Sequence, residues 1–372
     1  MRIETAHGAT GATAQAQHEM TVCNACRYCE AYCPVFQAME TRLTFTSGDV
    51  IYLANLCHNC GECLYACQYA PPHEFGIDVP KTMSALRVES YEMVAWPAAA
   101  GIAFRKPWIA TFVALIAGAL LVVAARSGPS IVDGTEPTSI VFYDVVSHRV
   151  MVTLFGAVGV FAVAALAVGY RRFTKATADA NSTAPLGRDS GAVTLAAGDA
   201  LTLRHLHTSG EDCTTAEETR TPWRRWMHHC TFYGFALCFA STAVAAVYHV
   251  AFGWVAPYDY TSLPVVLGTV GGVGLVVGPL GLFVVDRRSD PALIHGSQAA
   301  LDAPFLAMLF LTSATGLLLL ALRESAAMPS LLLVHLAFVL ALFVTLPYGK
   351  FVHGIYRAAA LVKFRTETAR KT

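Results

Sequence analysis

Eight of the eleven cysteines fall into two copies of one spacing, C-x2-C-x2-C-x3-C. The copies comprise Cys23, Cys26, Cys29 and Cys33, and then Cys57, Cys60, Cys63 and Cys67. Three thiolates on one tight turn can hold three corners of an iron–sulfur cube, while the fourth ligand comes from elsewhere in the fold. Structural zinc sites instead combine two C-x2-C pairs, so zinc is the less favoured alternative. The spacing predicts 4Fe–4S clusters.

The order of the two runs also predicts how the ligands are shared. In two-cluster ferredoxins the fourth cysteine of each run binds the other cluster. We therefore expect the first cluster on Cys23, Cys26, Cys29 and Cys67. We expect the second cluster on Cys57, Cys60, Cys63 and Cys33.

The rest of the chain is strongly apolar, with a mean hydropathy of +0.49 and 14% charged residues. Soluble domains carry about 25% charged residues. Six apolar runs approach or exceed the length of about 20 residues that crosses a bilayer. They lie at about 107–125, 149–170, 229–252, 262–285, 303–322 and 330–348. The fourth run holds six glycines, which predicts close helix approach, and Asp302 before Pro304 is expected to cap the fifth.

Charge in the loops predicts the orientation. Most loop Arg and Lys residues fall on one side of an alternating path, and that side is cytoplasmic by the positive-inside rule. The cysteine-rich domain and both termini share this side, and residues 1–20 contain no apolar stretch that would form a signal peptide. We expect a multi-pass protein of the bacterial cytoplasmic membrane, with its cysteines in the reducing cytoplasm. The 26 basic and 26 acidic residues balance, so net charge says nothing about nucleic acid, and we expect no nucleic-acid partner.

The predicted fold is mainly α, with an N-terminal two-cluster ferredoxin-like domain followed by a six-helix transmembrane bundle of cytochrome-b type. Its parts are a disordered N-terminus (1–20), the cluster domain (21–80), a linker or interfacial helix (81–106), transmembrane helices 1–2 (107–172), a cytoplasmic loop (173–228), transmembrane helices 3–6 (229–353) and a cytoplasmic tail (354–372).

Four histidines lie in or beside the expected spans, where an ionisable group is a functional candidate. His335 and His353 are 18 residues apart, which is five turns on one helix face if the helix continues through Pro347. His228 and His249 lie roughly 60° apart around the third span. This arrangement suits one or two b-type haems, with His249 paired with His335 and His228 with His353. The alternative is that such histidines, being common at helix ends, only face lipid headgroups.

Several segments besides the cysteine runs have a familiar form. They read CQYAPPHEFGIDVPKTMSALR, DALTLRHLH, PWRRWMHHCTFYGF, AFGWVAPYDY and LPYGKFVHGIYR. With the cysteines and the six spans, they make the chain resemble the tricarballylate/citrate-utilisation protein B family from about residue 18 onward, apart from a linker near 173–192. By a weaker analogy of fold, the membrane half is similar to the gamma subunit of respiratory nitrate reductase.

The resemblance implies a membrane electron conduit. Such a protein accepts electrons from a partner FAD-dependent tricarballylate dehydrogenase on the cytoplasmic face, and passes them through iron–sulfur clusters and haem to the quinone pool. Residues 1–80 contain no G-x-G-x-x-G flavin fingerprint, so we expect no substrate dehydrogenation on this chain.

Other functions fit the same features less well. The chain could serve another flavoprotein dehydrogenase or a heterodisulfide-type reductase, because the sequence of a conduit does not reveal the substrate. A membrane-anchored iron–sulfur redox sensor would not need six spans with paired histidines. A transporter would have no use for two clusters.

Overall fold

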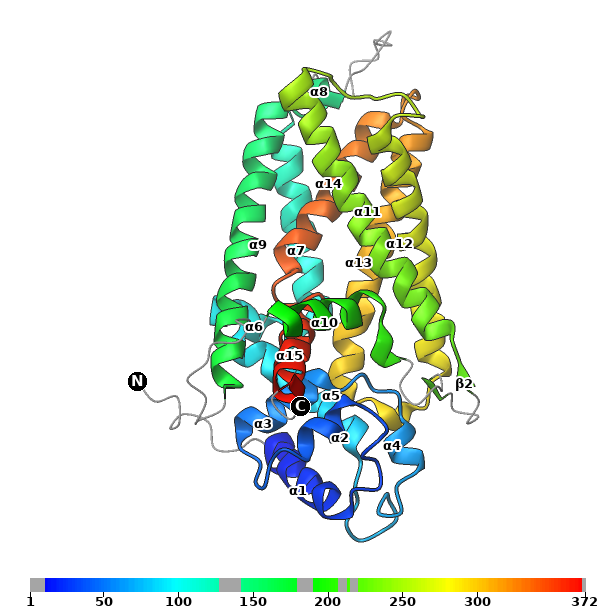
Figure 1. The fold of residues 1–372 in the computed structure, drawn as a ribbon. Helices are drawn as coiled ribbons and strands as arrows, with labels where there is room; N and C mark the ends of the chain where they lie inside the picture. Colours follow the sequence, from blue (N-terminus) through cyan, green and yellow to red (C-terminus); the bar gives the residue numbers. More distant parts are fainter. Residues whose placement is uncertain (1–10, 127–141, 179–189, 207–212, 215–219, 370–372) are drawn as a thin grey trace.

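The computed structural model describes residues 11–126, 142–178, 190–206, 213–214 and 220–369. It is mainly helical, with a small helical domain at one end of a bundle of long helices (Figure 1). The small domain contains α1 (Gly11–Cys26), α2 (Pro34–Met39), α3 (Ser47–Leu56), α4 (Glu62–Tyr65) and α5 (Val79–Val94).

Helix α1 corrects the expectation of disorder before residue 21, because residues 11–20 are helical. Ala16 and Met20, one turn apart, are both 0% exposed, and they pack into the core with Tyr52 and Met83. The segment is rich in small and polar residues and lacks an apolar run. Its order comes from one buried face rather than from its composition. Residues 1–10 lie outside the described part of the chain.

Helix α3 starts at a reciprocal cap. The Asp49 amide donates to Thr46 Oγ1 (3.2 Å), and the Thr46 amide donates to Asp49 Oδ2 (2.9 Å). Asp49 also accepts a hydrogen bond from Arg42 Nε at 2.7 Å. These contacts fix the loop that separates the two cysteine runs.

Residues 81–94 belong to the small domain and not to an interfacial linker. Helix α5 packs against α1 and α3, and its Met83 and Leu86 lie in their shared core. The short helix α6 (Ala98–Ala103) then leads to the bundle.

The six predicted spans are confirmed as helices long and apolar enough to cross a membrane. They are α7 (Pro107–Ala124), α9 (His148–Ala176), α11 (Trp223–Phe252), α12 (Leu263–Arg288), α13 (Gly296–Ala321) and α14 (Met328–Thr345). Exposed aromatic side chains lie at both ends of the bundle, as in the belts of membrane proteins. They include Trp108, Trp223 and Trp226 at the end near the small domain, and Trp254 and Tyr260 at the far end.

The glycines of α12 allow the close approach expected of them. Gly271, Gly274 and Gly278 face α11, and a Cβ added at Gly271 would lie 2.8 Å from the Cys238 amide nitrogen. Helix α13 differs from the expectation, because it begins at Gly296 with His295 as its N-cap. Asp302 therefore lies inside the helix, where it forms an ion pair with Lys350 at 2.6 Å.

The sixth span does not continue through Pro347, so the condition under which His335 and His353 would share one helix face is not met. Helix α14 ends at Thr345, and α15 (Val352–Ala369) begins a new helix after a turn that contains Pro347. Proline lacks the amide that the next helical hydrogen bond requires. The tail predicted for 354–372 is consequently an ordered helix over most of its length, and its Tyr356 and Phe364 are buried in the core of the small domain.

The loop between α9 and α11 is shorter than predicted, because both helices extend into 173–228. Within it, α10 (Ser190–Leu201) lies across the end of the bundle and packs on α15 (Figure 1). Two-residue strands, β1 (Cys213–Thr214) and β2 (Arg220–Thr221), pair before α11. The remaining short elements are α8 (Phe142–Val145) and the 3-10 helix η2 (Pro291–Leu293).

Candidate redox centres

The two cysteine runs share one backbone feature. The residue after the second cysteine of each run has a left-handed conformation, with φ 56° at Arg27 and φ 88° at Gly61. Glycine adopts this conformation without strain, and a Cβ at Gly61 would also meet the Leu293 side chain at 2.8 Å. The turn lets three thiols of each run face a common centre.

The first predicted ligand set surrounds one cavity. Cys23, Cys26, Cys29 and Cys67 all line a space of about 270 Å³, together with Cys63 and apolar neighbours. Burial raises the pKa of the Cys29 thiol to about 11, and the neighbouring Cys67 and Cys26 add to that rise. Without a bound cation, these cysteines would not all be deprotonated together, because buried thiolates repel one another.

The second predicted set lines another, smaller cavity of about 20 Å³. Its wall includes Cys33, Cys57, Cys60 and Cys63. Burial raises the pKa of the Cys33 thiol to about 12, with a further contribution from Cys57. Each cavity therefore has three thiols of one run and the fourth cysteine of the other run, and Cys63 lies between the two cavities.

The thiols fit an iron–sulfur cluster better than a single ion. Among the described residues, no three His, Cys, Asp or Glu side chains converge closely enough to hold one metal ion. Zinc would need four sulfurs at roughly 2.3 Å from one point. The thiols spread around the 270 Å³ cavity of the first set suit a multi-iron cluster, whose iron supplies the positive charge that stabilises buried thiolates. The 20 Å³ cavity of the second set has the same type of lining and would have to widen to hold such a cluster.

Two of the four candidate histidines meet at the end of the bundle near the small domain. The rings of His228 on α11 and His353 on α15 lie 6.0 Å apart at 78°. Two imidazoles that bind one metal from opposite sides at roughly 2 Å per bond have ring centres about 6 Å apart. His353 Nδ1 lies 2.6 Å from the Lys350 carbonyl oxygen, which leaves Nε2 available as a ligand. His228 Nδ1 is buried without a partner in the described structure. The pair fits axial ligation of a haem.

The other two candidates have different neighbours. His335 Nδ1 lies 3.1 Å from the Thr312 carbonyl oxygen, and its ring packs against Gly316. His249 stacks on His148 of α9, with ring centres 3.7 Å apart. The structure does not describe a contact between His249 and His335. His148 was not among the four candidates, although it is the first residue of α9 and lies at the same end of the bundle as His249.

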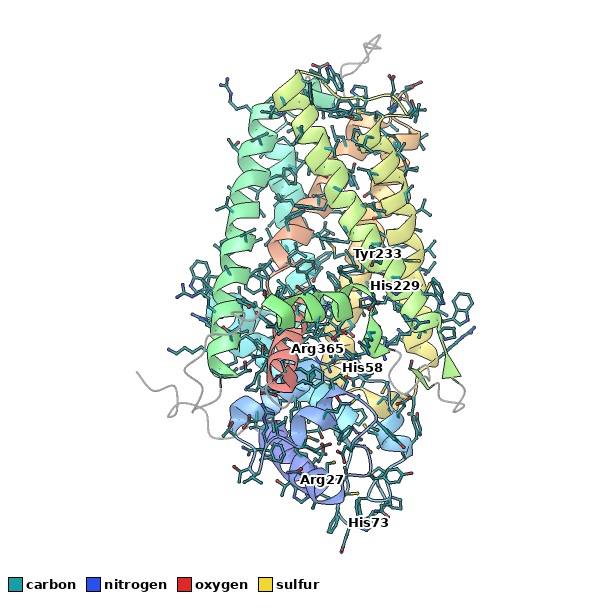
Figure 2. The ribbon with its side chains drawn as sticks, viewed as in Figure 1. Arg27, His58, His73, His229, Tyr233 and Arg365 are labelled. Atoms are coloured by element: carbon teal, nitrogen blue, oxygen red, sulfur yellow. The ribbon has the colours of Figure 1, made fainter. Side chains whose placement is uncertain are left out.

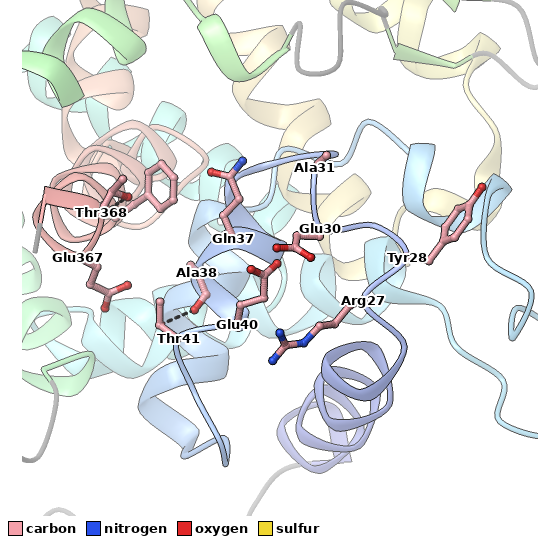
Figure 3. A pocket seen from close by; sticks show the side chains of 11 residues that line it. Arg27, Tyr28, Glu30, Ala31, Gln37, Ala38, Glu40, Thr41, Glu367 and Thr368 are labelled. Atoms are coloured by element: carbon pink, nitrogen blue, oxygen red, sulfur yellow. Dashed lines mark hydrogen bonds between the residues drawn. The ribbon is translucent and has the colours of Figure 1, made fainter. Parts of the chain in front are cut away.

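A larger hollow lies beside the first cysteine run. It encloses about 660 Å³ between that run, α2 and α15 (Figure 3). Glu30, Glu40 and Glu367 line it, with Arg27 and Tyr28 at its edge near the cysteines. The Arg27 side of the domain lies at the end away from the bundle, whereas His58 lies where domain and bundle meet (Figure 2).

This arrangement defines an integral membrane protein in which a domain of iron–sulfur type is joined to six apolar helices. The family model "Citrate utilization protein B Fer4-like domain" matches residues 16–93, and the model "Citrate utilization protein B" matches residues 105–372. The chain is 45% identical over 360 residues to "Citrate utilization protein B" of Escherichia coli, covering 96% of this chain and 93% of the relative. The chain therefore belongs to the citrate utilization protein B family, as its motifs suggested. No solved structure matches it.

Proposed function

We propose that this chain is a membrane electron conduit. It accepts electrons from a partner FAD-dependent dehydrogenase of tricarballylate or a related tricarboxylate, and it delivers them through two 4Fe–4S clusters and b-type haem to the quinone pool. The observation that supports the proposal is the lining of the two cysteine cavities, each of which contains the fourth cysteine of the other run. The name of the Escherichia coli relative supports a tricarboxylate as the substrate class.

Iron–sulfur clusters and haem supply one-electron chemistry, so that the two electrons of a reduced flavin leave one at a time. The eight cysteines of the two runs would hold the clusters. His228 and His353 would hold a haem at the end of the bundle facing the cluster domain. Cys57 is close to this pair through α15, because Arg357 Nη1 lies 3.3 Å from the Cys57 carbonyl oxygen and His353 is one helical turn before Arg357.

A second haem would lie toward the far end of the bundle. His249 and His335 remain its predicted ligands, and His148 is a further candidate because its ring stacks on that of His249. Both histidines of the stacked pair lie at helix ends away from the cluster domain. An iron held there would extend the path across the membrane.

The partner flavoprotein is proposed to dock on the cytoplasmic face of the cluster domain. The hollow of Figure 3 supports this position, because it adjoins the first cysteine run and the exposed carboxylate of Glu30 in its lining suits a basic partner surface. Tyr28, on the loop between Cys26 and Cys29, is 66% exposed there and offers an aromatic contact.

Metal analysis of the purified protein tests the proposal. We expect about eight iron and eight sulfide ions per chain, as two 4Fe–4S clusters require, together with a reducible b-type haem spectrum. Cys60→Ser should lower the iron content and stop electron flow from the flavoprotein to quinone, while Cys238→Ser, which alters a cysteine of α11, should change neither. Zinc in place of iron, or assembled protein without haem absorbance, would contradict the proposal.

A further inference from the structure

Three arginines from different helices converge on the second cysteine run where it meets the bundle. Arg87 of α5 donates from Nη2 to the Cys57 carbonyl oxygen (2.5 Å) and to Asn59 Oδ1 (2.7 Å). Arg357 of α15 donates to the same Cys57 carbonyl at 3.3 Å. Arg224 of α11 donates to the Asn59 carbonyl at 2.7 Å. We call Arg87, Arg224 and Arg357 the arginine layer.

Two members of this layer have neutral hydrogen-bond partners only, within the described residues. Arg87 is 7% exposed, and its remaining bonds go to the Ala54 carbonyl (3.0 Å) and to Gln298 Oε1 (2.8 Å). The nearby carboxylate of Asp302 is already paired with Lys350. Arg224 also interacts with Asp286, so the argument depends on Arg87 and Arg357.

Buried cations without a counter-anion are costly, so a negative group nearby would stabilise Arg87 and Arg357. Burial, with repulsion from Arg87, lowers the pKa of Arg357 to about 10. Four thiolates around an iron–sulfur cluster give a net negative charge, and reduction adds one more. The second cysteine set supplies this charge directly beside the layer.

The first cysteine set has the opposite surroundings. Glu19, one helical turn before Cys23 on α1, is 0% exposed. Arg27, within the first run, is exposed, and water screens its charge. Arg42 is buried but is paired with Asp49 and Glu367. No unpaired buried guanidinium is described beside this set.

We propose that Arg87 and Arg357 raise the reduction potential of the cluster on the second cysteine set above that of the cluster on the first. Positive charge nearby stabilises the reduced form, because net charge and hydrogen bonds set the potentials of such clusters. Burial alone would act in the opposite direction, since reduction adds charge in a medium of low polarity, and the arginines outweigh it. With both clusters bound, transfer of one electron from the first to the second would oxidise the first and reduce the second, with no proton transferred and no bond changed. The arginine layer thus directs electrons from the exposed side of the domain toward the membrane.

This inference depends on the proposed function, and a redox titration separates the two. Full-length detergent-solubilised protein would be titrated with electron paramagnetic resonance detection of both clusters. We expect two midpoints in the wild type. In Arg357→Gln the higher midpoint potential should fall while the lower one stays unchanged. For a one-electron couple, a fall of about 59 mV corresponds to a tenfold change in the equilibrium constant for electron transfer between the clusters. Arg357→Lys should restore most of the shift, and Arg365→Gln, two turns along the same helix, should show none.

A second variant keeps the test decisive if Arg357→Gln fails to assemble. Gln298→Glu replaces the amide bonded to Arg87 by a carboxylate of the same shape, so it neutralises part of the layer and adds an ion pair. The higher midpoint should again fall. Unchanged midpoints in variants with full iron content, or a fall of the lower midpoint, would overturn the inference. A wild type without two iron–sulfur signals would instead overturn the proposed function.

Discussion

Arg42 and Glu367 lie 325 residues apart in the sequence, and a 2.6 Å ion pair joins them within the cluster domain. Arg42 also pairs with Asp49, and its guanidinium stacks over Tyr52 at 5.0 Å. The last helix of the chain is thereby fixed against the loop between the two cysteine runs. The helix that carries His353 is held at both of its ends, by the bundle and by the cluster domain.

Removing this contact should destabilise the cluster domain. Glu367→Ala leaves Arg42 with one carboxylate instead of two in a largely buried position, and we expect a loss of about 1–3 kcal/mol. Thermal unfolding monitored by cluster absorbance would measure it. Glu92→Ala breaks the exposed pair with Arg105 and should have little effect, because water and salt screen that pair. Equal effects of both variants would contradict a special role for the α15 contact.

The haem proposal makes a spectroscopic prediction about neighbouring histidines. His353→Ala and His228→Ala should each remove the absorbance of the haem nearest the cluster domain, because each would remove one of the two residues proposed to hold it. His229→Ala is the matched control. His229 follows His228, roughly 100° further around α11, and it stacks on Tyr233 with ring centres 5.7 Å apart (Figure 2).

The measurement is the reduced-minus-oxidised spectrum together with haem content per chain. If His229→Ala removes haem absorbance and His228→Ala does not, the assignment of the α11 ligand is wrong. His335→Ala and His249→Ala should leave the haem near the cluster domain intact.

Close helix packing predicts that Gly271 cannot be enlarged. Gly271→Ala places a methyl group 2.8 Å from the Cys238 nitrogen and from the Gly234 carbonyl oxygen, so α11 and α12 must separate. Overpacking of this kind costs about 1–3 kcal/mol, and it should lower the unfolding temperature in detergent. Gly156→Ala on α9 meets no atom within 4 Å and should be neutral or slightly stabilising. Equal unfolding temperatures for the two variants would argue against the α11–α12 contact.

Stability should fall in mild acid because of His205. Burial is the main cause that lowers the pKa of this imidazole from 6.5 to about 4, against the attraction of Asp199. The folded protein then binds fewer protons than the unfolded chain between these values. The stabilising contribution of His205 is present above pH 6.5 and is lost as the pH falls toward 4. The full loss is of order 3 kcal/mol.

Unfolding measured at pH 7 and pH 5 would check this prediction. His205→Gln should flatten the pH dependence of the free energy of unfolding, while His18→Gln, which changes an exposed histidine of α1, should not. An unaltered slope in His205→Gln would show that another group causes the acid sensitivity.

Features that depend on neighbours in the sequence are the ones that sequence reasoning predicts best. The cysteine spacing predicts that three thiols of each run serve one centre, because the three thiols of a C-x2-C-x2-C run lie too close together to serve separate centres, and the fourth ligand stays a prediction from the ferredoxin pattern. The six spans were correct in position, because crossing a membrane requires a length of apolar residues that can be counted. Helix ends were less accurate, as at Gly296 and Trp223, because polar residues extend helices into the adjoining loops.

The predictions were wrong for segments whose helices are stabilised by contacts with residues far away in the sequence. Residues 11–20 carry no apolar run, yet Met20 is buried by α3 and α5, which come later in the chain. The C-terminal helix was expected to be a tail, because nothing local reveals that Phe364 packs into a domain more than 300 residues earlier.

The sequence by itself determined which residues can bind metal and which stretches can enter a membrane, since both follow from short-range spacing and composition. Tertiary structure decided which histidines lie together and that Arg87 and Arg357 converge on Cys57. The turn at Pro347 reorients α15, so that His353 reaches His228 and Arg357 reaches Cys57. Such contacts between distant residues depend on how whole helices pack, and no local sequence pattern encodes the direction in which a helix leaves a turn.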